Sequence, residues 1–155
     1  MAMNELGAYS GMRRTVGPDG PNFFLLGAHK SGTTALFHDL TRHPGVFPAP
    51  VKETFFFADH AEYARGLDYY ERQFFSGARD YPARGEGTPK YLFEGDVVAP
   101  RIRHYLGPAK ARMIVLLRDP VKRAWSHYRY TQLRRGLPDR KSTRLNSSHL
   151  VISYA

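Results

Sequence analysis

Short apolar runs alternate with stretches of helical spacing along the chain, and this alternation predicts the class of fold. The runs NFFLLG (22–27) and ARMIVLL (111–117) are short and rich in bulky apolar residues, as expected for buried strands. Apolar residues recur at helical spacing in four other segments: 33–43, 61–74, 97–106 and 120–135. Strands that alternate with helices form a parallel sheet covered by helices. The pattern therefore predicts an α/β fold with three layers, a parallel sheet flanked by helices.

Turn-forming residues mark the boundaries between these segments. The stretch PGVFPAP (44–50) is predicted to be a loop, and ARGEGTP (83–89) resembles the end of a strand entering a loop. Gly66 weakens the helix predicted over 61–74. Asp119 is a good N-cap and Pro120 a good first residue for the last helix, which we expect to run to about residue 135.

The two ends of the chain differ in character from the middle. Residues 1–21 are rich in glycine and polar groups and are expected to form a flexible leader. Back-translation of DRKSTRLNSSHLVISYA (139–155) in one frame gives a sequence that resembles a common sequencing-library adapter, so this segment is an expected artefact and is left out of fold prediction. We therefore expect a partial domain over 22–138 that is truncated at its C-terminus.

Composition narrows the classes of partner. The chain has 155 residues, which suits one domain, and a formal net charge of +9, which favours anionic partners. It has no cysteine, so disulfides and cysteine-ligated metals are excluded. No apolar run has the length of a signal peptide or a membrane span, and a cytoplasmic location is therefore expected.

The segment GAHKSGTT (27–34) follows the first predicted strand and opens a helix. Its glycines, Gly27 and Gly32, have the spacing of a phosphate-binding loop, but Thr33 stands where a nucleotide-triphosphate loop has its lysine, and the lysine is Lys30. Backbone N–H groups at the start of a helix, together with the hydroxyls of Thr33 and Thr34, can bind an oxyanion. The segment therefore predicts a P-loop-like anion site.

A second candidate site, LLRDPVKRAWSHY (116–128), follows the second predicted strand. Arg118 lies where that strand ends, the usual ligand side of a parallel sheet, and its planar guanidinium matches a phosphate group. Ser126 lies about two turns into the next helix, so both side chains can flank one anion if the chain folds back. In the alternative, purely structural interpretation, Arg118 forms an ion pair with Asp119 or another nearby acid.

Together the two segments resemble the sulfotransferases that use 3′-phosphoadenosine 5′-phosphosulfate (PAPS). HKSGTTAL looks like the family's loop for the 5′-phosphosulfate, and LRDPVKRAWSHY looks like its 3′-phosphate motif. HPGVFPAPVKETFFF and GEGTPKYL are similar to the bacterial and heparan-sulfate-type branch, and the resemblance covers about residues 22–136.

The resemblance implies a role for each matching residue. Lys30 would act at the bridging oxygen of PAPS, and Glu53 would be the general base that takes the proton of an acceptor hydroxyl. The 5′-phosphate loop is His29, Lys30, Ser31, Gly32, Thr33 and Thr34. Arg118 and Ser126 would hold the 3′-phosphate. The acceptor would be a glycan, a lipid or a small molecule with a hydroxyl group, and neither a metal nor a nucleic acid is expected.

Glu53 also has a plain alternative role as a surface acid paired with Lys52. The chain departs from the family where some members read E-K-T-P, because here Gly87 replaces that lysine. Lys90 lies nearby in the sequence, but as a predicted strand residue it would point elsewhere.

Two other classes of protein remain open from the residues. A P-loop nucleotide kinase or NTPase would need a lysine after Gly32 and a magnesium-binding acid at the end of a strand, where this chain has Arg118. A basic nucleic-acid-binding module would fit the net charge, but the arginines are scattered without an aromatic-interleaved surface pattern.

Overall fold

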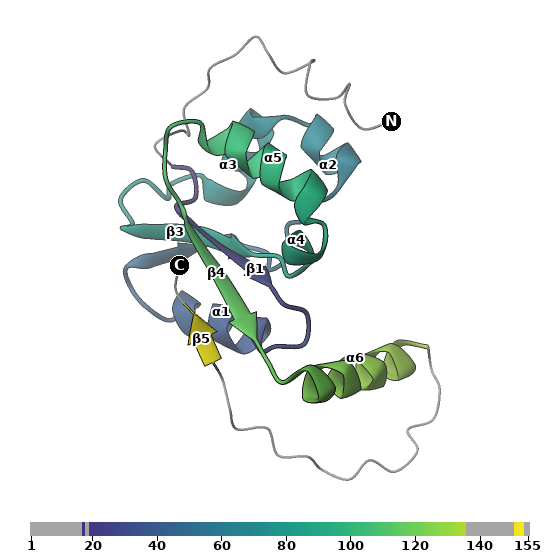
Figure 1. The fold of residues 1–155 in the computed structure, drawn as a ribbon. Coiled ribbons are helices and arrows are strands. Elements are labelled where there is room, and N and C mark those ends of the chain that lie inside the picture. Colours follow the sequence, from purple (N-terminus) through teal and green to yellow (C-terminus); the bar gives the residue numbers. More distant parts are fainter. Residues whose placement is uncertain (1–16, 18, 136–150, 154–155) are drawn as a thin grey trace.

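A twisted sheet with the strand order β2-β3-β1-β4-β5 forms the middle layer of the protein (Figure 1). The computed structural model describes residues 17, 19–135 and 151–153. The strands are β1 (Phe23–Gly27), β2 (Val46–Pro48), β3 (Ala83–Gly87), β4 (Arg112–Leu117) and β5 (Val151–Ser153). The four strands β2, β3, β1 and β4 pair in parallel, which confirms the predicted α/β class.

The fifth strand is the exception to the parallel pattern. β5 pairs antiparallel with β4, forms the edge of the sheet on that side, and lies inside the segment 139–155 that sequence analysis left out of the fold. The predicted leader (1–21) and the rest of that tail lie almost entirely outside the described residues, so the predicted domain limits stay predictions.

The structure adds one strand to the prediction and gives the full extent of another. Residues 44–50 were predicted to be a loop, but they contain β2, whose Pro48 is tolerated because β2 is an edge strand that needs fewer backbone donors. β3 is a full strand, and its Gly85 lies so close to β1 that an added Cβ atom would be 2.2 Å from the carbonyl oxygen of Phe23.

The described residues also form six helices. They are α1 (Thr33–Thr41), α2 (His60–Ala64), α3 (Leu67–Phe75), α4 (Lys90–Phe93), α5 (Gly95–Leu106) and α6 (Pro120–Arg134) among the described residues. The single helix predicted over 61–74 is wrong, because Gly66 adopts a positive φ of 88° and separates α2 from α3. Asp119 caps α6 as predicted and accepts the backbone N–H of Lys122 at 2.8 Å.

The two faces of the sheet carry different cores. α1 covers one face, and α2, α3 and α5 lie on the other (Figure 1). Because side chains alternate along a strand, Leu25 packs with the α1 side while Phe24 packs into the larger core on the opposite side. That larger core is largely aromatic, and its fully buried rings include Phe56, Phe57 and Tyr70.

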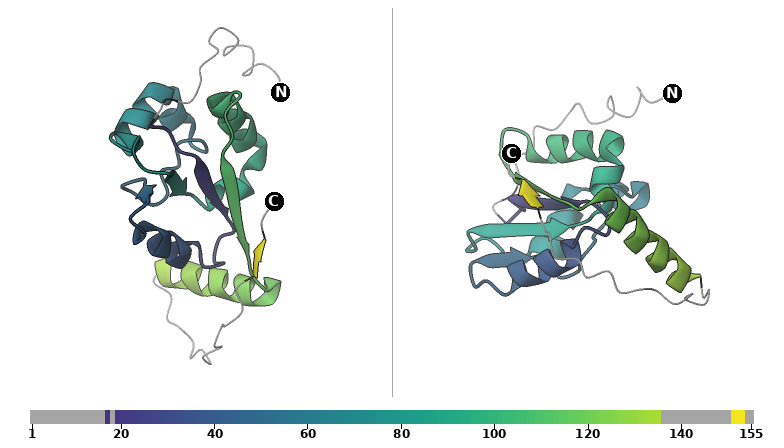
Figure 2. Two further views of the ribbon diagram at one scale, coloured as in Figure 1. Left: turned by 90° about the vertical axis from the view of Figure 1, so that its left-hand side faces the viewer. Right: turned by 60° about the horizontal axis from the view of Figure 1, so that its bottom comes forward.

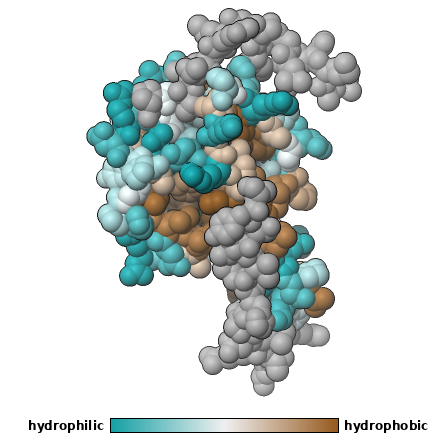
Figure 3. All heavy atoms as spheres, turned by 60° about the vertical axis from the view of Figure 1, so that its left-hand side comes forward, coloured by the Kyte–Doolittle hydropathy of each residue, from teal (hydrophilic) through white to brown (hydrophobic). Residues whose placement is uncertain are grey.

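The last helix stands apart from these layers. α6 leaves the end of β4 and projects away from the rest of the molecule (Figure 2), and none of its residues is buried among the described residues. Figure 3, in which the left-hand side of Figure 1 comes forward, shows hydrophobic residues gathered near the middle of this face with hydrophilic residues beside them. No helix within the described ranges is both long enough and apolar enough to cross a membrane.

The close approach of β3 to β1 predicts a large effect of Gly85→Ala. The new methyl group would overlap backbone atoms that cannot move alone, so we expect a loss of about 2–4 kcal/mol in the free energy of unfolding. Urea denaturation followed by circular dichroism measures this loss. Gly95→Ala is the matched control, because an added Cβ at Gly95 has no neighbour within 4 Å, and it should change stability by less than about 1 kcal/mol.

Candidate active site

Three parallel strands end at the same edge of the sheet, and the candidate residues lie just beyond their carboxyl ends. β1 ends at Gly27, β3 at Gly87 and β4 at Leu117. The loops that follow carry Lys30, Thr88 and Arg118. In open parallel sheets this edge is where ligands bind.

The loop after β1 leads directly into α1. Gly32 is the N-cap of α1 with a positive φ of 99°, and no described side chain caps the helix. The first N–H groups of a helix have no partner within the helix, so they are free to bind an anion here. Thr33 is buried and Thr34 is exposed at the start of this helix.

The side chain of Ser31, in this loop, lacks a hydrogen-bond partner among the described residues. This side chain is buried, and the atom without a partner is its hydroxyl oxygen. A buried hydroxyl without a partner is costly, and a ligand oxygen at the loop would satisfy it.

Two hydrogen bonds join the loop after β1 to the end of β4. The backbone N–H of Ala28 donates to the carbonyl of Leu116 at 2.9 Å. The Arg118 guanidinium donates to the carbonyl oxygen of Lys30 at 3.1 Å, across 88 positions of sequence. The partner of Arg118 in this contact is therefore a backbone carbonyl, and not the neighbouring acid of the alternative prediction.

A cavity of about 360 Å³ lies between this loop and α6. Its lining includes Lys30, Arg118 and Ser126, so the structure brings residues of both predicted anion motifs to one place. Sequence analysis missed further lining residues from α6, which are Lys122, Trp125, Arg129, Tyr130 and Leu133. Lys122, Arg129, Tyr130 and Leu133 lie one or two helical turns from Ser126, and that spacing was the signal that could have identified these four.

Basic groups dominate this cavity. Lys30 lies with its Nζ 4.1 Å from the centre of the Tyr130 ring, a cation–π contact. Four basic side chains, Lys30, Arg118, Lys122 and Arg129, line the same volume. Such a concentration of positive charge attracts a ligand that carries several negative charges.

Glu53 lies in the turn that follows β2. Its carboxylate pairs with Lys52 Nζ at 2.6 Å and about 30% of its side chain is exposed, so the predicted alternative pairing is present. Its backbone N–H donates to the carbonyl of Gly87 at the end of β3. Burial is the main cause that lowers the pKa of His29, and the negative charge of Glu53 opposes that shift. Glu53 and His29 therefore belong to one electrostatic neighbourhood beside the loop.

Gly87, which stands where some family members have the lysine of E-K-T-P, lies close to side chains on the α1 side of the sheet. An added Cβ at Gly87 would lie 3.0 Å from the ring of Phe37 and 3.4 Å from Leu25, so α1 packing fills that space. Lys90, expected on a strand, is instead the first residue of α4 and pairs with Glu94 at 3.0 Å.

Sequence analysis also missed a buried carboxylate next to this edge. Glu86 of β3 is fully buried and accepts hydrogen bonds from four hydroxyl groups, those of Thr54, Tyr70, Thr88 and Tyr91. Burial raises the pKa of Glu86, and the hydrogen bonds from its hydroxyl partners act in the opposite direction. The sequence signal was weak because a glutamate between two glycines looks like an exposed turn.

Comparison with known proteins decides the family. The model of the sulfotransferase domain family matches residues 20–151. The chain belongs to the sulfotransferase domain family. It is 37% identical over 113 residues to the membrane-associated sulfotransferase kil1 of Dictyostelium discoideum, which covers 72% of this chain and 23% of that protein. It is 35% identical over 121 residues to the human bifunctional heparan sulfate N-deacetylase/N-sulfotransferase 3, covering 71% of this chain and 13% of that protein.

A solved structure supports the same family. The crystal structure of a sulfotransferase from Alicyclobacillus acidocaldarius superposes with a TM-score of 0.62 at 32% identity and covers 78% of this chain and 53% of that one. The predicted family and α/β fold are therefore confirmed. The chain spans less than a quarter of these two curated relatives, and the roles of individual site residues stay predictions.

The left-handed N-cap predicts that Gly32→Ala damages the loop. Alanine at a φ of 99° is strained, so stability should fall by about 1–2 kcal/mol. Affinity for adenosine 3′,5′-bisphosphate, measured by calorimetry, should fall about tenfold because the loop N–H groups move.

Gly77→Ala provides the matched control for this variant. Gly77 has a φ of 81° and open space around it, but it lies after α3, away from the loop. It should lose similar stability with unchanged affinity. Equal loss of affinity in both variants would contradict a specific role for Gly32.

Proposed function

We propose that this protein transfers a sulfuryl group from PAPS to a hydroxyl group of an acceptor. The observation that carries the proposal is the shared cavity, in which Lys30 of the first motif meets Arg118 and Ser126 of the second. PAPS, the donor that the family uses, carries anionic groups at both its 5′ and 3′ positions. Two anion-binding motifs in one basic cavity suit such a donor.

We assign the groups of the donor to the two motifs. The N–H groups at the start of α1, with Gly32, Thr33 and Thr34, would hold the 5′-phosphate, and the unpartnered Ser31 hydroxyl and His29 would lie beside it. Arg118 and Ser126 would hold the 3′-phosphate. Lys30 would leave the Tyr130 ring to reach the bridging oxygen, where negative charge develops as the sulfur–oxygen bond breaks.

Glu53 is the proposed general base. The acceptor oxygen forms a bond to sulfur, the bond between sulfur and the bridging oxygen breaks, and the electron pair leaves with the phosphate. The acceptor proton passes to the Glu53 carboxylate. Its partial exposure and its charge interaction with His29 support this role, because a base must reach an incoming substrate beside the donor loop.

The acceptor class follows from the relatives only in outline. One relative is named as a heparan sulfate N-sulfotransferase, and another is named as a membrane-associated sulfotransferase. We propose a hydroxyl-bearing glycan, lipid or small molecule as the acceptor, without a nucleic acid or a metal. A nucleotide kinase is less well supported, because Arg118, and not an acid, directly follows the end of β4.

The donor assignment predicts specific losses of ligand stabilisation. Adenosine 3′,5′-bisphosphate at a hundredfold excess over its Kd should stabilise the protein by about 2.7 kcal/mol, and thermal unfolding measures this effect. Lys30→Ala and Arg118→Ala should each weaken affinity about tenfold or more, because each removes a charge-assisted contact.

Arg112→Ala is the matched control for these variants, since Arg112 is exposed at the opposite end of the same strand. It should leave the stabilisation unchanged. Stabilisation by ATP with magnesium, without any effect of the bisphosphate, would refute the sulfotransferase proposal.

The base assignment predicts a different result for Glu53→Gln. Transfer from PAPS to O-desulfated, N-acetylated heparin, whose acceptor groups are hydroxyls, should fall by at least about a hundredfold. Bisphosphate affinity should stay the same because Glu53 would contact the acceptor and not the donor. Radiolabelled sulfate incorporation and calorimetry measure the two quantities, and lost donor affinity would contradict the assignment.

A further inference from the structure

The turn that carries Glu53 has an unusual backbone. Glu53 and Phe55 both adopt left-handed conformations, with φ values of 67° and 56°. Residues with side chains rarely adopt such conformations, which persist only where the surroundings hold them. Thr54, the residue between them, is where the turn is held.

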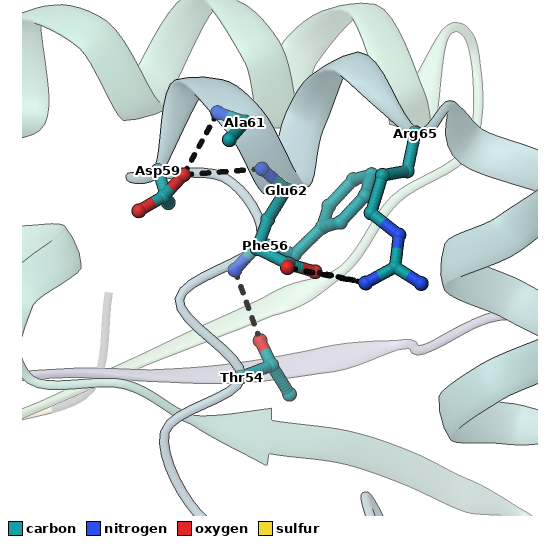
Figure 4. Close-up of polar contacts among 6 residues, drawn as sticks. All are labelled: Thr54, Phe56, Asp59, Ala61, Glu62 and Arg65. Carbon is teal, nitrogen blue, oxygen red and sulfur yellow. Dashed lines mark hydrogen bonds and ion pairs between the residues drawn. The ribbon is translucent and has the colours of Figure 1, made fainter.

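Thr54 is buried and fastened to the interior. Its hydroxyl donates to a carboxylate oxygen of Glu86 and lies 3.1 Å from the hydroxyl of Tyr91. The same hydroxyl oxygen accepts the backbone N–H of Phe56 at 3.4 Å (Figure 4). One side chain therefore ties the middle of the turn both to β3 and to the backbone that follows.

Glu86 is saturated by hydroxyl donors. Thr54 and Thr88 donate to one carboxylate oxygen, with Thr88 at 2.8 Å. Tyr70 and Tyr91 donate to the other at 2.6 Å and 3.1 Å. A carboxylate with two donors on each oxygen has a single preferred orientation, so it is a rigid anchor.

A second bond fastens the same turn to the next residue of β3. The backbone N–H of Glu53 donates to the carbonyl of Gly87 at 3.1 Å. Consecutive residues of β3 thus hold consecutive residues of the turn, Glu86 through a side chain and Gly87 through the backbone. The two bonds together fix the backbone of the turn, and with it the direction of the Glu53 side chain.

We propose that Glu86 is a positioning residue, whose buried carboxylate holds Thr54 and thereby keeps Glu53 in its left-handed conformation beside the donor loop. This inference rests on the proposed role of Glu53 as the base. Glu86 itself lies in the core and acts only through Thr54.

Two variants separate positioning from general stability. Thr54→Val and Tyr70→Phe each remove one hydroxyl donor from Glu86 and keep a similar shape. Only Thr54 adjoins Glu53 in the chain. Tyr70→Phe is therefore a control for the loss of one hydrogen bond to the same carboxylate.

Amide exchange measured by NMR on the full chain tests the anchor without turnover. In Thr54→Val, protection of the Glu53 and Phe56 amides should fall about tenfold beyond any global change, because the turn opens locally. In Tyr70→Phe these amides should follow global stability alone. Thr54→Ser, which restores a hydroxyl, should recover protection.

Turnover tests the consequence for catalysis. With PAPS and O-desulfated, N-acetylated heparin, Thr54→Val should lower kcat about tenfold while bisphosphate affinity stays unchanged, and Tyr70→Phe should retain kcat. Equal exchange and equal kcat in the two variants would overturn the positioning role. If Glu53→Gln keeps full transfer while Thr54→Val still loses protection, the assignment of the base fails and the anchor stands.

Discussion

The parallel pairing of β1 with β4 is the constraint on which the rest of the site depends. Because both strands run in the same direction, the segments that follow them emerge at one edge, and Arg118 reaches the carbonyl of Lys30 across 88 positions of sequence. An antiparallel arrangement would have placed the two motifs at opposite ends of the sheet. The anion-binding cavity is thus a consequence of strand direction before it is a consequence of any single side chain.

A second dependence runs from the aromatic core to the same edge. Phe56 and Phe57 are fully buried, and the Phe57 ring packs against the rings of Phe24, Tyr70, Tyr91 and Tyr105. These rings fix the chain immediately after Glu53, and the Glu86 carboxylate fixes it at Thr54. The segment that carries the proposed base is therefore fixed both by the aromatic core and by the end of β3.

The basic cavity has an energetic cost in the absence of a ligand. Several cationic groups face one volume, and their repulsion is reduced by local partners such as the Tyr130 ring beside Lys30. An anionic ligand replaces this repulsion with attraction, so binding energy is stored in the arrangement of charges.

Local pattern was enough to predict the strands at 22–27 and 111–117, the helices that follow them, the N-cap at Asp119 and the α/β class, since these depend on neighbours in the chain. The resemblance of two motifs also predicted the family.

Sequence alone did not reveal β2 or the break at Gly66, nor that Gly85 must be a glycine because β1 passes close to it. Glu86, Lys122 and Tyr130 were missed for the same reason. Burial of a carboxylate among hydroxyls, and the meeting of a helix face with a loop, depend on residues far apart in sequence, and only tertiary packing brings those together.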